Sequence, residues 1–243
     1  MSDPAAANAS SLERLIPKEL GVSDITGAET YRLHIERYDF AANFVDAGRV
    51  LDCACGVGYG SERLSRAGGG SQFVTGVDID PAAVEYARLH YQSERVEFVC
   101  ADGARFDGEP FDTIVSFETI EHVPDPESLI DNLARLLKPG GTLIASVPVT
   151  PSVDVNPYHL HDFTQSSFRR MLEKRGFIEL DSFLQRQPYR PLKIATRSET
   201  RLADMRRNLV GYYATHPLAA IKRAHSTVVD GFCNKYLACA WRR

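Results

Sequence analysis

The sequence lacks any run of about 18 apolar residues, the length that a membrane-spanning helix requires. Its first ten residues, MSDPAAANAS, include an acidic residue and contain no apolar stretch of the kind that marks a signal peptide. We therefore expect neither a transmembrane segment nor a secretory leader.

The sequence also lacks an excess of basic residues and has few cysteines. Its 28 Lys and Arg stand against 32 Asp and Glu, a formal net charge of -4. Proteins that bind the phosphate backbone usually have a basic surface, so we expect no nucleic-acid partner. Five cysteines, at 53, 55, 100, 233 and 239, show no disulfide framework. We expect them to stay reduced, which predicts a cytoplasmic protein.

What the sequence does contain is the pattern of one α/β domain. Hydrophobic residues make up 44% of its 243 residues, enough for a single large core. Predicted strands alternate with predicted helices from residue 49 to 185, which is typical of a parallel sheet with helices on both faces. Asp80, Asp125 and Thr164 stand where side chains cap helix N-termini.

The segment 50–60, VLDCACGVGYG, joins an apolar strand that ends at Asp52 to a glycine-rich loop. Glycine permits backbone conformations and close approach that a side chain blocks. Gly56 and Gly58 therefore let the chain turn tightly against a ligand at a helix N-terminus. The segment predicts a site for a nucleoside-containing cofactor.

A second predicted strand, residues 73–80, carries Asp78 near its end. A carboxylate there can accept hydrogen bonds from both ribose hydroxyls, as in dinucleotide sites. A dinucleotide-dependent dehydrogenase is thus one interpretation. It is disfavoured because Ser61 occupies the third glycine position of the dinucleotide motif and because Asp52 would repel a pyrophosphate.

The order of these segments, over roughly residues 45–185 and the final strand, resembles the class I S-adenosylmethionine-dependent methyltransferases. Asp52, Gly56 and Gly58 match the first motif of that class, whereas Ala54 stands at its first glycine. We infer from this departure that position 54 needs no positive φ. The segments FDTIVSFETIEHV (111–123) and LLKPGGTLIASVP (136–148) resemble the fourth and fifth strand regions of the class.

The resemblance implies an α/β fold, a Rossmann-like doubly wound sheet of seven strands with an antiparallel last strand and helices on both faces. It implies S-adenosyl-L-methionine as the cofactor and S-adenosyl-L-homocysteine as its product. Asp78 is then assigned to the ribose hydroxyls and Asp102 to the adenine amino group. The implied cofactor contacts are Asp52, Ala54, Gly56, Gly58, Asp78, Ile79, Asp102, Gly103 and Phe117.

Two shorter phrases, FETIEH and NPYHLHDFT, narrow the resemblance. They are similar to methyltransferases of bacterial glycan and secondary-metabolite pathways, and to small-molecule O-methyltransferases of the quinone-pathway type. We expect methyl transfer to a hydroxyl of a small molecule or of a glycan or secondary-metabolite precursor. Two alternatives stay open: N-methylation of an amino sugar or another amine, and an inactive cofactor-binding module.

His122 is the predicted catalytic base. It follows the fourth predicted strand, whose carboxyl end should face the ligand crevice, and histidine is the residue type best suited to exchange protons near neutral pH. A histidine after a strand can also serve only to bond backbone groups. A third interpretation groups His122 with Glu118 and Glu121 as ligands of Mg²⁺ or a transition ion. Carboxylates that orient the histidine or cap the next segment explain the same residues, so we predict no metal.

Four residues are predicted to contact the acceptor. The resemblance suggests that His159, after the fifth strand, lies near it, and we assign Glu118 to the same role. Tyr31 and His34 complete the set, because Tyr31, His34 and Tyr38 recur at i, i+3 and i+7 on one helix face. That face either closes over the pocket or only docks the helix.

We divide the chain into an N-terminal helical lid or cap, residues 1–46, and a methyltransferase domain, residues 47–243. Residues 11–46 are expected to be helical, with a turn near Gly21 and Gly27. Within the latter, residues 186–226 are expected to form a helical insertion with nine basic residues against Glu199 and Asp204. The insertion is interpreted either as a docking site for an anionic or carrier-linked substrate, or as a lid or homodimer contact. The basic residues are Arg186, Arg190, Lys193, Arg197, Arg201, Arg206, Arg207, Lys222 and Arg223.

Overall fold

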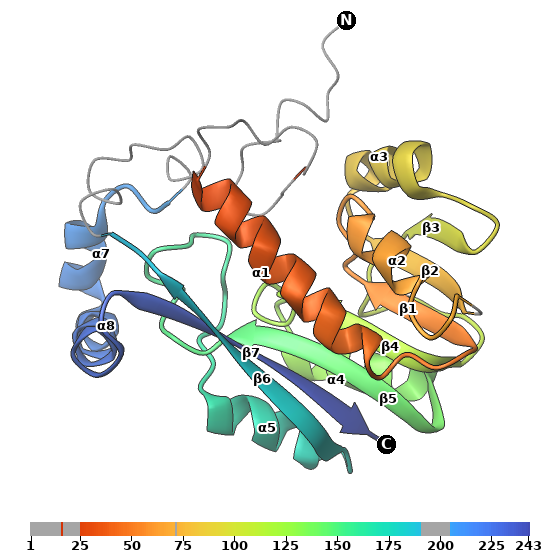
Figure 1. The fold of residues 1–243 in the computed structure, drawn as a ribbon. Helices are drawn as coiled ribbons and strands as arrows, with labels where there is room; N and C mark the ends of the chain where they lie inside the picture. Colours follow the sequence, from red (N-terminus) through yellow and green to blue (C-terminus); the bar gives the residue numbers. More distant parts are fainter. Residues whose placement is uncertain (1–15, 17–24, 71, 191–204) are drawn as a thin grey trace, which may run out of the picture.

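The computed structural model describes residues 25–70, 72–190 and 205–243, together with Ile16. One seven-stranded sheet in the order β3-β2-β1-β4-β5-β7-β6 runs through these residues (Figure 1). Strands β1 to β5 pair in parallel, and β7 pairs antiparallel with both β5 and β6. The predicted fold, a doubly wound seven-stranded sheet with an antiparallel last strand, is confirmed.

The elements have the following bounds. The strands are β1 (Arg49–Cys53), β2 (Phe73–Asp78), β3 (Val96–Cys100), β4 (Phe111–Phe117), β5 (Leu137–Pro148), β6 (Ile178–Pro188) and β7 (Cys233–Arg242). The helices are α1 (Ile25–Ala42), α2 (Tyr59–Leu64), α3 (Pro81–Tyr91), α4 (Pro126–Leu136), α5 (Gln165–Glu173), α7 (Leu209–Thr215) and α8 (Pro217–Asp230).

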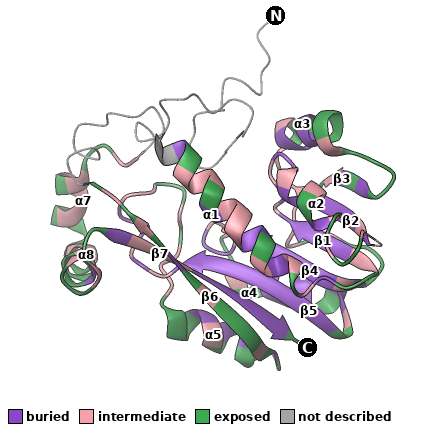
Figure 2. Cartoon of the chain, viewed as in Figure 1, coloured by how far each residue is buried: buried purple, intermediate pink, exposed green. Residues whose placement is uncertain are grey.

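Helices cover both faces of the sheet, as expected. Successive strand residues point to opposite faces, so each strand contributes to two hydrophobic cores. On β5, Leu143 and Ala145 join the core beneath α4 and α5, while Ile144 joins the core beneath α1, α2 and α3. The sheet between these two layers is largely buried (Figure 2).

The three predicted helix caps are present. Asp80 accepts a hydrogen bond from the Ala82 backbone, Asp125 accepts one from the Ser128 backbone, and Thr164 forms a capping box at α5. The turn expected near Gly27 is wrong, because α1 runs through that residue. The turn expected at Gly21 lies outside the described residues.

Two expectations about the whole chain can also be compared with the structure. All five cysteines are free thiols. Within the described residues, no helix is both long enough and apolar enough to span a bilayer.

Candidate functional site

The carboxyl ends of the parallel strands open into one large cavity. The loops after β1, β2, β3, β4 and β5 enclose it together with α1, and its volume is about 1410 Å³. Pockets for one small ligand usually measure roughly 300–1,000 Å³. The cavity therefore has room for a cofactor and a second molecule side by side.

The glycine-rich loop forms one wall of this cavity. Gly56 has a φ of 56°, and a Cβ added there would meet no atom within 4 Å, so its surface is open to a ligand. At Gly58 a Cβ would lie 2.7 Å from the Ala87 Cβ, so this position permits close packing of the loop on α3. Gly56 thus fits a ligand-facing role and Gly58 a packing role.

The expectation for position 54 is wrong. Ala54 has a φ of 64°, in the left-handed region that L-residues rarely adopt. The chain turns sharply here, because the Cys55 amide still donates to the Val77 carbonyl of β2 at 3.0 Å while the loop leaves the sheet. The turn geometry is kept although the residue is not glycine.

Asp78 holds the loop and also lines the cavity. One carboxylate oxygen accepts from the Gly56 amide at 2.8 Å, and the other accepts from the Asp80 amide at 2.9 Å. The loop after β1 is thereby fixed to the end of β2. A carboxylate oxygen can accept more than one hydrogen bond, so these contacts are compatible with ribose binding.

Asp52 lies behind the loop and is not among the cavity-lining residues. Its carboxyl group is buried and accepts hydrogen bonds from the Ser61 hydroxyl at 2.7 Å and the Tyr38 hydroxyl at 3.2 Å. Burial raises the pKa of Asp52 to about 7, and the charge of Asp78 adds to the rise. Its predicted cofactor contact stays a prediction, and the structure gives it a second role in joining α1 to the loop.

The other predicted cofactor residues either line the cavity or pack behind its wall. Ala54, Ile79, Asp102 and Phe117 line the cavity. Gly103 does not, and a Cβ there would come within 2.5 Å of the Cys53 Sγ. Gly103 is therefore a position of close packing behind the wall.

His122 lines the cavity after β4, as the sequence predicted. Its Nδ1 lies 3.2 Å from the Tyr158 carbonyl oxygen, which can only accept, so Nδ1 donates. Its Nε2 lies 3.9 Å from the buried Glu121 carboxyl group. A neutral imidazole in this tautomer carries its proton-accepting lone pair on Nε2.

His159 stands against His122 in the cavity wall. The ring centroids are 4.6 Å apart and the rings are nearly perpendicular, while Nδ1 of His159 lies 2.7 Å from the Ser152 hydroxyl. Burial, together with the charge of His122, lowers the pKa of His159 to about 3. His159 is thus a neutral hydrogen-bonding group near neutral pH.

The metal-ligand atoms that lie together belong to a different trio from the one weighed and set aside in the sequence analysis. Glu121, His122 and His159 each place one such atom within 4.8 Å of the others. Glu118 faces the cavity with a φ of 49° and accepts a hydrogen bond from Ser146 at 2.7 Å. The absence of a metal stays a prediction.

Helix α1 is tied to the glycine loop through Tyr59. The ring of Tyr59 packs on Tyr31, with centroids 5.5 Å apart, and on Tyr38 at 6.1 Å, and its hydroxyl lies 2.7 Å from His34 Nδ1. A Cβ on Gly60 would lie 1.9 Å from the Tyr38 ring. The predicted shared face of α1 is confirmed, and it docks on this loop; His34 also lines the cavity, whereas Tyr31 does not.

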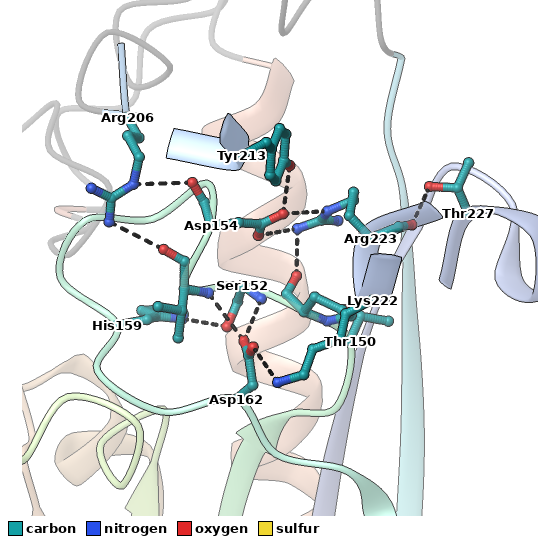
Figure 3. A network of polar contacts seen from close by, with 12 residues as sticks. Thr150, Ser152, Asp154, His159, Asp162, Arg206, Tyr213, Lys222, Arg223 and Thr227 are labelled. Atoms are coloured by element: carbon teal, nitrogen blue, oxygen red, sulfur yellow. Dashed lines mark hydrogen bonds and ion pairs between the residues drawn. The ribbon is translucent and has the colours of Figure 1, made fainter. Parts of the chain in front are cut away.

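The predicted basic insertion has two of its arginines turned inward. Arg223 donates hydrogen bonds to both carboxylate oxygens of the buried Asp154, at 2.6 and 2.8 Å. The Tyr213 hydroxyl donates to the same carboxylate at 2.6 Å (Figure 3). Arg206 donates to the carbonyls of Asp154 and Val153. These contacts fasten α7 and α8 to the loop after β5, which lines the cavity.

The remaining basic residues are placed differently or not described. Strand β6 extends through Arg186 to Pro188, so the first residues of the expected helical insertion belong to the sheet instead, and Arg190 lines the cavity. Lys193, Arg197 and Arg201, like Glu199 and Asp204, lie outside the described residues.

Sequence reasoning missed three residues of the site. Tyr59 had a usable signal, since an aromatic residue inside a glycine-rich loop needs a packing partner. Ser152 and Asp154 had none, because their partners His159 and Arg223 are 7 and 69 residues away in the chain.

Comparison with known proteins adds a family match. Residues 51–145 match the model of the methyltransferase domain. The ubiquinone biosynthesis O-methyltransferase of Xylella fastidiosa (strain 9a5c) is 38% identical over 127 residues, which cover 48% of this chain and 49% of that protein. The match therefore spans about half the length of the curated relative.

Two solved structures illustrate the likeness of fold. Magnesium protoporphyrin IX methyltransferase from Synechocystis PCC 6803, with bound S-adenosylmethionine, gives a TM-score of 0.58 at 18% identity and covers 92% of this chain and 86% of that chain. The N-methyltransferase NodS from Bradyrhizobium japonicum WM9, in complex with S-adenosylhomocysteine, gives 0.59 at 14% identity and covers 100% and 99%. At such identities the likeness shows the fold alone.

Proposed function

We propose that this chain, which its family match and fold identify as a class I S-adenosylmethionine-dependent methyltransferase, transfers a methyl group to a hydroxyl of a small molecule. The class carries with it the cofactor expected from the sequence, S-adenosyl-L-methionine. The residues around the cavity fit that cofactor. Gly56 leaves open space at the wall, and the carboxylates of Asp78 and Asp102 face the same cavity.

The position of His122 is the observation that favours a hydroxyl acceptor. The cofactor supplies an electrophilic methyl group, so the protein must place the acceptor oxygen in line with it and remove one proton. His122 lines the same cavity as the glycine loop, and its hydrogen bond to the Tyr158 carbonyl leaves the basic lone pair on Nε2. The hydroxyl proton would pass to that nitrogen as the oxygen–carbon bond forms and the methyl–sulfur bond breaks, with S-adenosyl-L-homocysteine as the leaving group.

His159, Ser152 and Glu118 support positioning of the acceptor. His159 is neutral and held by Ser152, so it can donate or accept a hydrogen bond without adding charge beside His122. Glu118, in the loop after β4 that also carries His122, accepts a hydrogen bond from Ser146 of β5. Fixed side chains of this kind reduce the entropy lost when donor and acceptor meet.

The acceptor class rests on the curated relatives. Their name places them in ubiquinone biosynthesis, so a hydroxyl on a quinone-type ring is our first candidate. A glycan or secondary-metabolite precursor remains a second candidate from the sequence. Arg190 in the cavity wall would favour an acceptor with an anionic group.

N-methylation is the alternative that one comparison favours, because NodS is an N-methyltransferase of similar fold. An amine needs only to be neutral in order to attack, so a strong base contributes less. Strict dependence on His122 would therefore separate the two reactions.

The test replaces His122 by Gln, which keeps a polar side chain but cannot act as the base. We expect kcat to fall about 10²- to 10⁴-fold with unchanged affinity for S-adenosylhomocysteine. His225→Gln, at an exposed position on α8, is the matched control and should leave kcat unchanged. Near wild-type kcat in His122→Gln would refute the role of His122 as base.

The metal prediction is tested with the same assay. We expect EDTA to leave the initial rate unchanged, because the proposed step uses only His122 as the proton acceptor. Loss of activity in EDTA and its recovery with one added divalent ion would instead assign Glu121, His122 and His159 to that ion.

A further inference from the structure

Helix α8 turns an apolar face away from the protein. Leu218, Ile221, Val228 and Val229 are between 63% and 85% exposed. At 3.6 residues per turn these four side chains, with the exposed His225, lie within about one third of the helix circumference. A surface helix of a globular protein normally shows the opposite arrangement.

The inward face of α8 is polar. Arg223 forms the ion pair with Asp154, Ser226 is buried, and Asp230 is paired with Lys235 of β7. Ion pairs and hydrogen bonds, rather than a hydrophobic contact, therefore hold α8 in place. The orientation of the helix is fixed by specific charges, so its apolar side is held outward.

The segments next to α8 in the chain also expose apolar side chains. Val210 of α7 is 83% exposed and Phe232, just after α8, is 52% exposed. Figure 2 shows α8 as mostly exposed. We define the α8 surface as Val210, Leu218, Ile221, Val228, Val229 and Phe232. Large exposed apolar patches of this kind usually mark interaction sites.

The charge around this surface favours one kind of partner. Residues 205–232 carry four basic side chains; Arg223 is neutralised by Asp154 and Lys222 lies 3.6 Å from Asp162, so Arg206 and Arg207 supply the excess of positive charge. Arg207 and Lys222 are exposed. Basic side chains beside an apolar helix face are the composition that binds anionic lipid surfaces.

We propose that the α8 surface docks the protein reversibly on an anionic phospholipid bilayer. A second copy of the chain fits less well, because a symmetric contact through this surface would bring the two basic segments together. The surface also adjoins the site: Arg223 binds the Pro151 carbonyl and Asp154, and Pro151 lines the cavity. Docking does not depend on methyl transfer, so the two can fail separately.

The test is co-sedimentation of the full chain with vesicles of phosphatidylcholine and phosphatidylglycerol in equal parts. We expect wild-type protein to bind them, to bind pure phosphatidylcholine much more weakly, and to be released by added salt. Ile221→Asp combined with Val228→Asp should lower vesicle affinity on the order of 10-fold or more, because it removes two apolar side chains and adds like charge to an anionic surface.

Two matched controls place the effect on this surface. Leu89→Asp changes an equally exposed leucine on α3 and should leave vesicle binding unchanged. Lys222→Glu should weaken binding, whereas Lys174→Glu, at the end of α5, should weaken it less. Unchanged affinity for S-adenosylhomocysteine verifies that each variant is folded.

Three results would overturn the proposal: no binding of wild-type protein to the anionic vesicles, binding that survives the double substitution, or equal loss in Leu89→Asp. Concentration-dependent dimers that the double substitution abolishes would instead assign the surface to a second copy.

Discussion

Two residues at the cavity wall have backbone conformations that L-residues avoid. Ala54 has a φ of 64° and Glu118 a φ of 49°, and each directly follows the last residue of a parallel strand. Backbone strain of this kind concentrates at functional sites, where the surrounding structure holds it in place. The sharp turn after β1 presents the glycine loop to the cavity.

Replacing Ala54 by Gly should relieve this strain. The left-handed conformation costs an L-residue roughly 1–2 kcal/mol, while the added freedom of glycine in the unfolded chain costs about 0.4–1 kcal/mol. We expect a higher free energy of unfolding in urea, by up to about 1 kcal/mol. Ala224→Gly, at an exposed position inside α8, is the control and should destabilise by about 1 kcal/mol. Equal losses in both variants would contradict strain at Ala54.

Asp52 makes stability depend on pH in a defined direction. In the unfolded chain its carboxyl group titrates near the ordinary value of 3.8, whereas burial raises its pKa in the folded protein to about 7. Between these values the folded state binds more protons than the unfolded state. The contribution of Asp52 to the free energy of unfolding therefore falls as the pH rises through this window, and stays lowered above it.

Asp52→Asn removes the titration and keeps a polar group beside Tyr38 and Ser61. The free energy of unfolding of the variant minus that of wild type should be greater at about pH 8 than at about pH 5. We expect this difference to grow by at least about 1 kcal/mol. The lowered pKa of His159 also destabilises the fold as the pH falls. Because His159 is present in both proteins, its effect cancels in the comparison. Urea unfolding at both pH values measures the difference, and a difference that does not change with pH would contradict a raised pKa.

At the scale of elements, the α7–α8 pair depends on a buried ion pair. Asp154 is 2% exposed, and although burial alone would raise its pKa, the hydrogen bonds and charge of Arg223 hold it below its ordinary value. Removing one partner of such a pair leaves a buried charge without its counter-ion. The pair thus holds α8 against the loop that lines the cavity.

Arg223→Met should destabilise the protein by about 3 kcal/mol, measured by urea unfolding. Arg135→Met, which breaks the exposed pair with Asp107, is the control and should cost less than about 1 kcal/mol. Adding Asp154→Leu to Arg223→Met should recover part of the loss, because no buried charge remains. Equal effects of the two single substitutions would show that the Asp154 pair contributes no more than a surface contact.

The elements themselves were largely predictable from the sequence, for local reasons. Asp80, Asp125 and Thr164 cap helices through bonds to residues two or three positions away, so the pattern is legible in the chain. The prediction for Ala54 was wrong because an alanine does not by itself indicate the turn at this position. That turn depends on the hydrogen bond from the Cys55 amide to the Val77 carbonyl of β2. The contacts of Asp154 and Arg223 depend on how distant elements pack, and no local pattern encodes that.

At the scale of the whole molecule, topology decides where the site lies. The parallel strands place Asp78, Phe117 and His122 at one edge of the sheet, as the order of segments predicted. The sequence could not show that α1 docks on the glycine loop through Tyr59, or that His159 meets His122, since both depend on loop paths. The size of the cavity likewise emerges only from the assembled fold.

Cofactor binding should stabilise the whole domain. A ligand that binds only the folded state at about 100 times its Kd raises the free energy of unfolding by about 2.7 kcal/mol. We expect a rise in Tm with S-adenosylhomocysteine and none with NAD. Asp78→Ala should lower this Tm shift, because it removes a cavity-lining carboxylate and frees the loop at Gly56. Stabilisation by NAD alone would favour the dehydrogenase interpretation.

The most direct test is transfer of an isotope-labelled methyl group from S-adenosylmethionine to acceptors. Quinone-type phenols, glycosides, amines and small-molecule fractions of a bacterial extract would be compared with wild-type protein and His122→Gln. We predict a labelled product whose NMR signal is that of a methoxy carbon, formed by wild type and strongly reduced in His122→Gln. Label found only on nitrogen, or no transfer by protein that binds S-adenosylhomocysteine tightly, would contradict an O-methyltransferase.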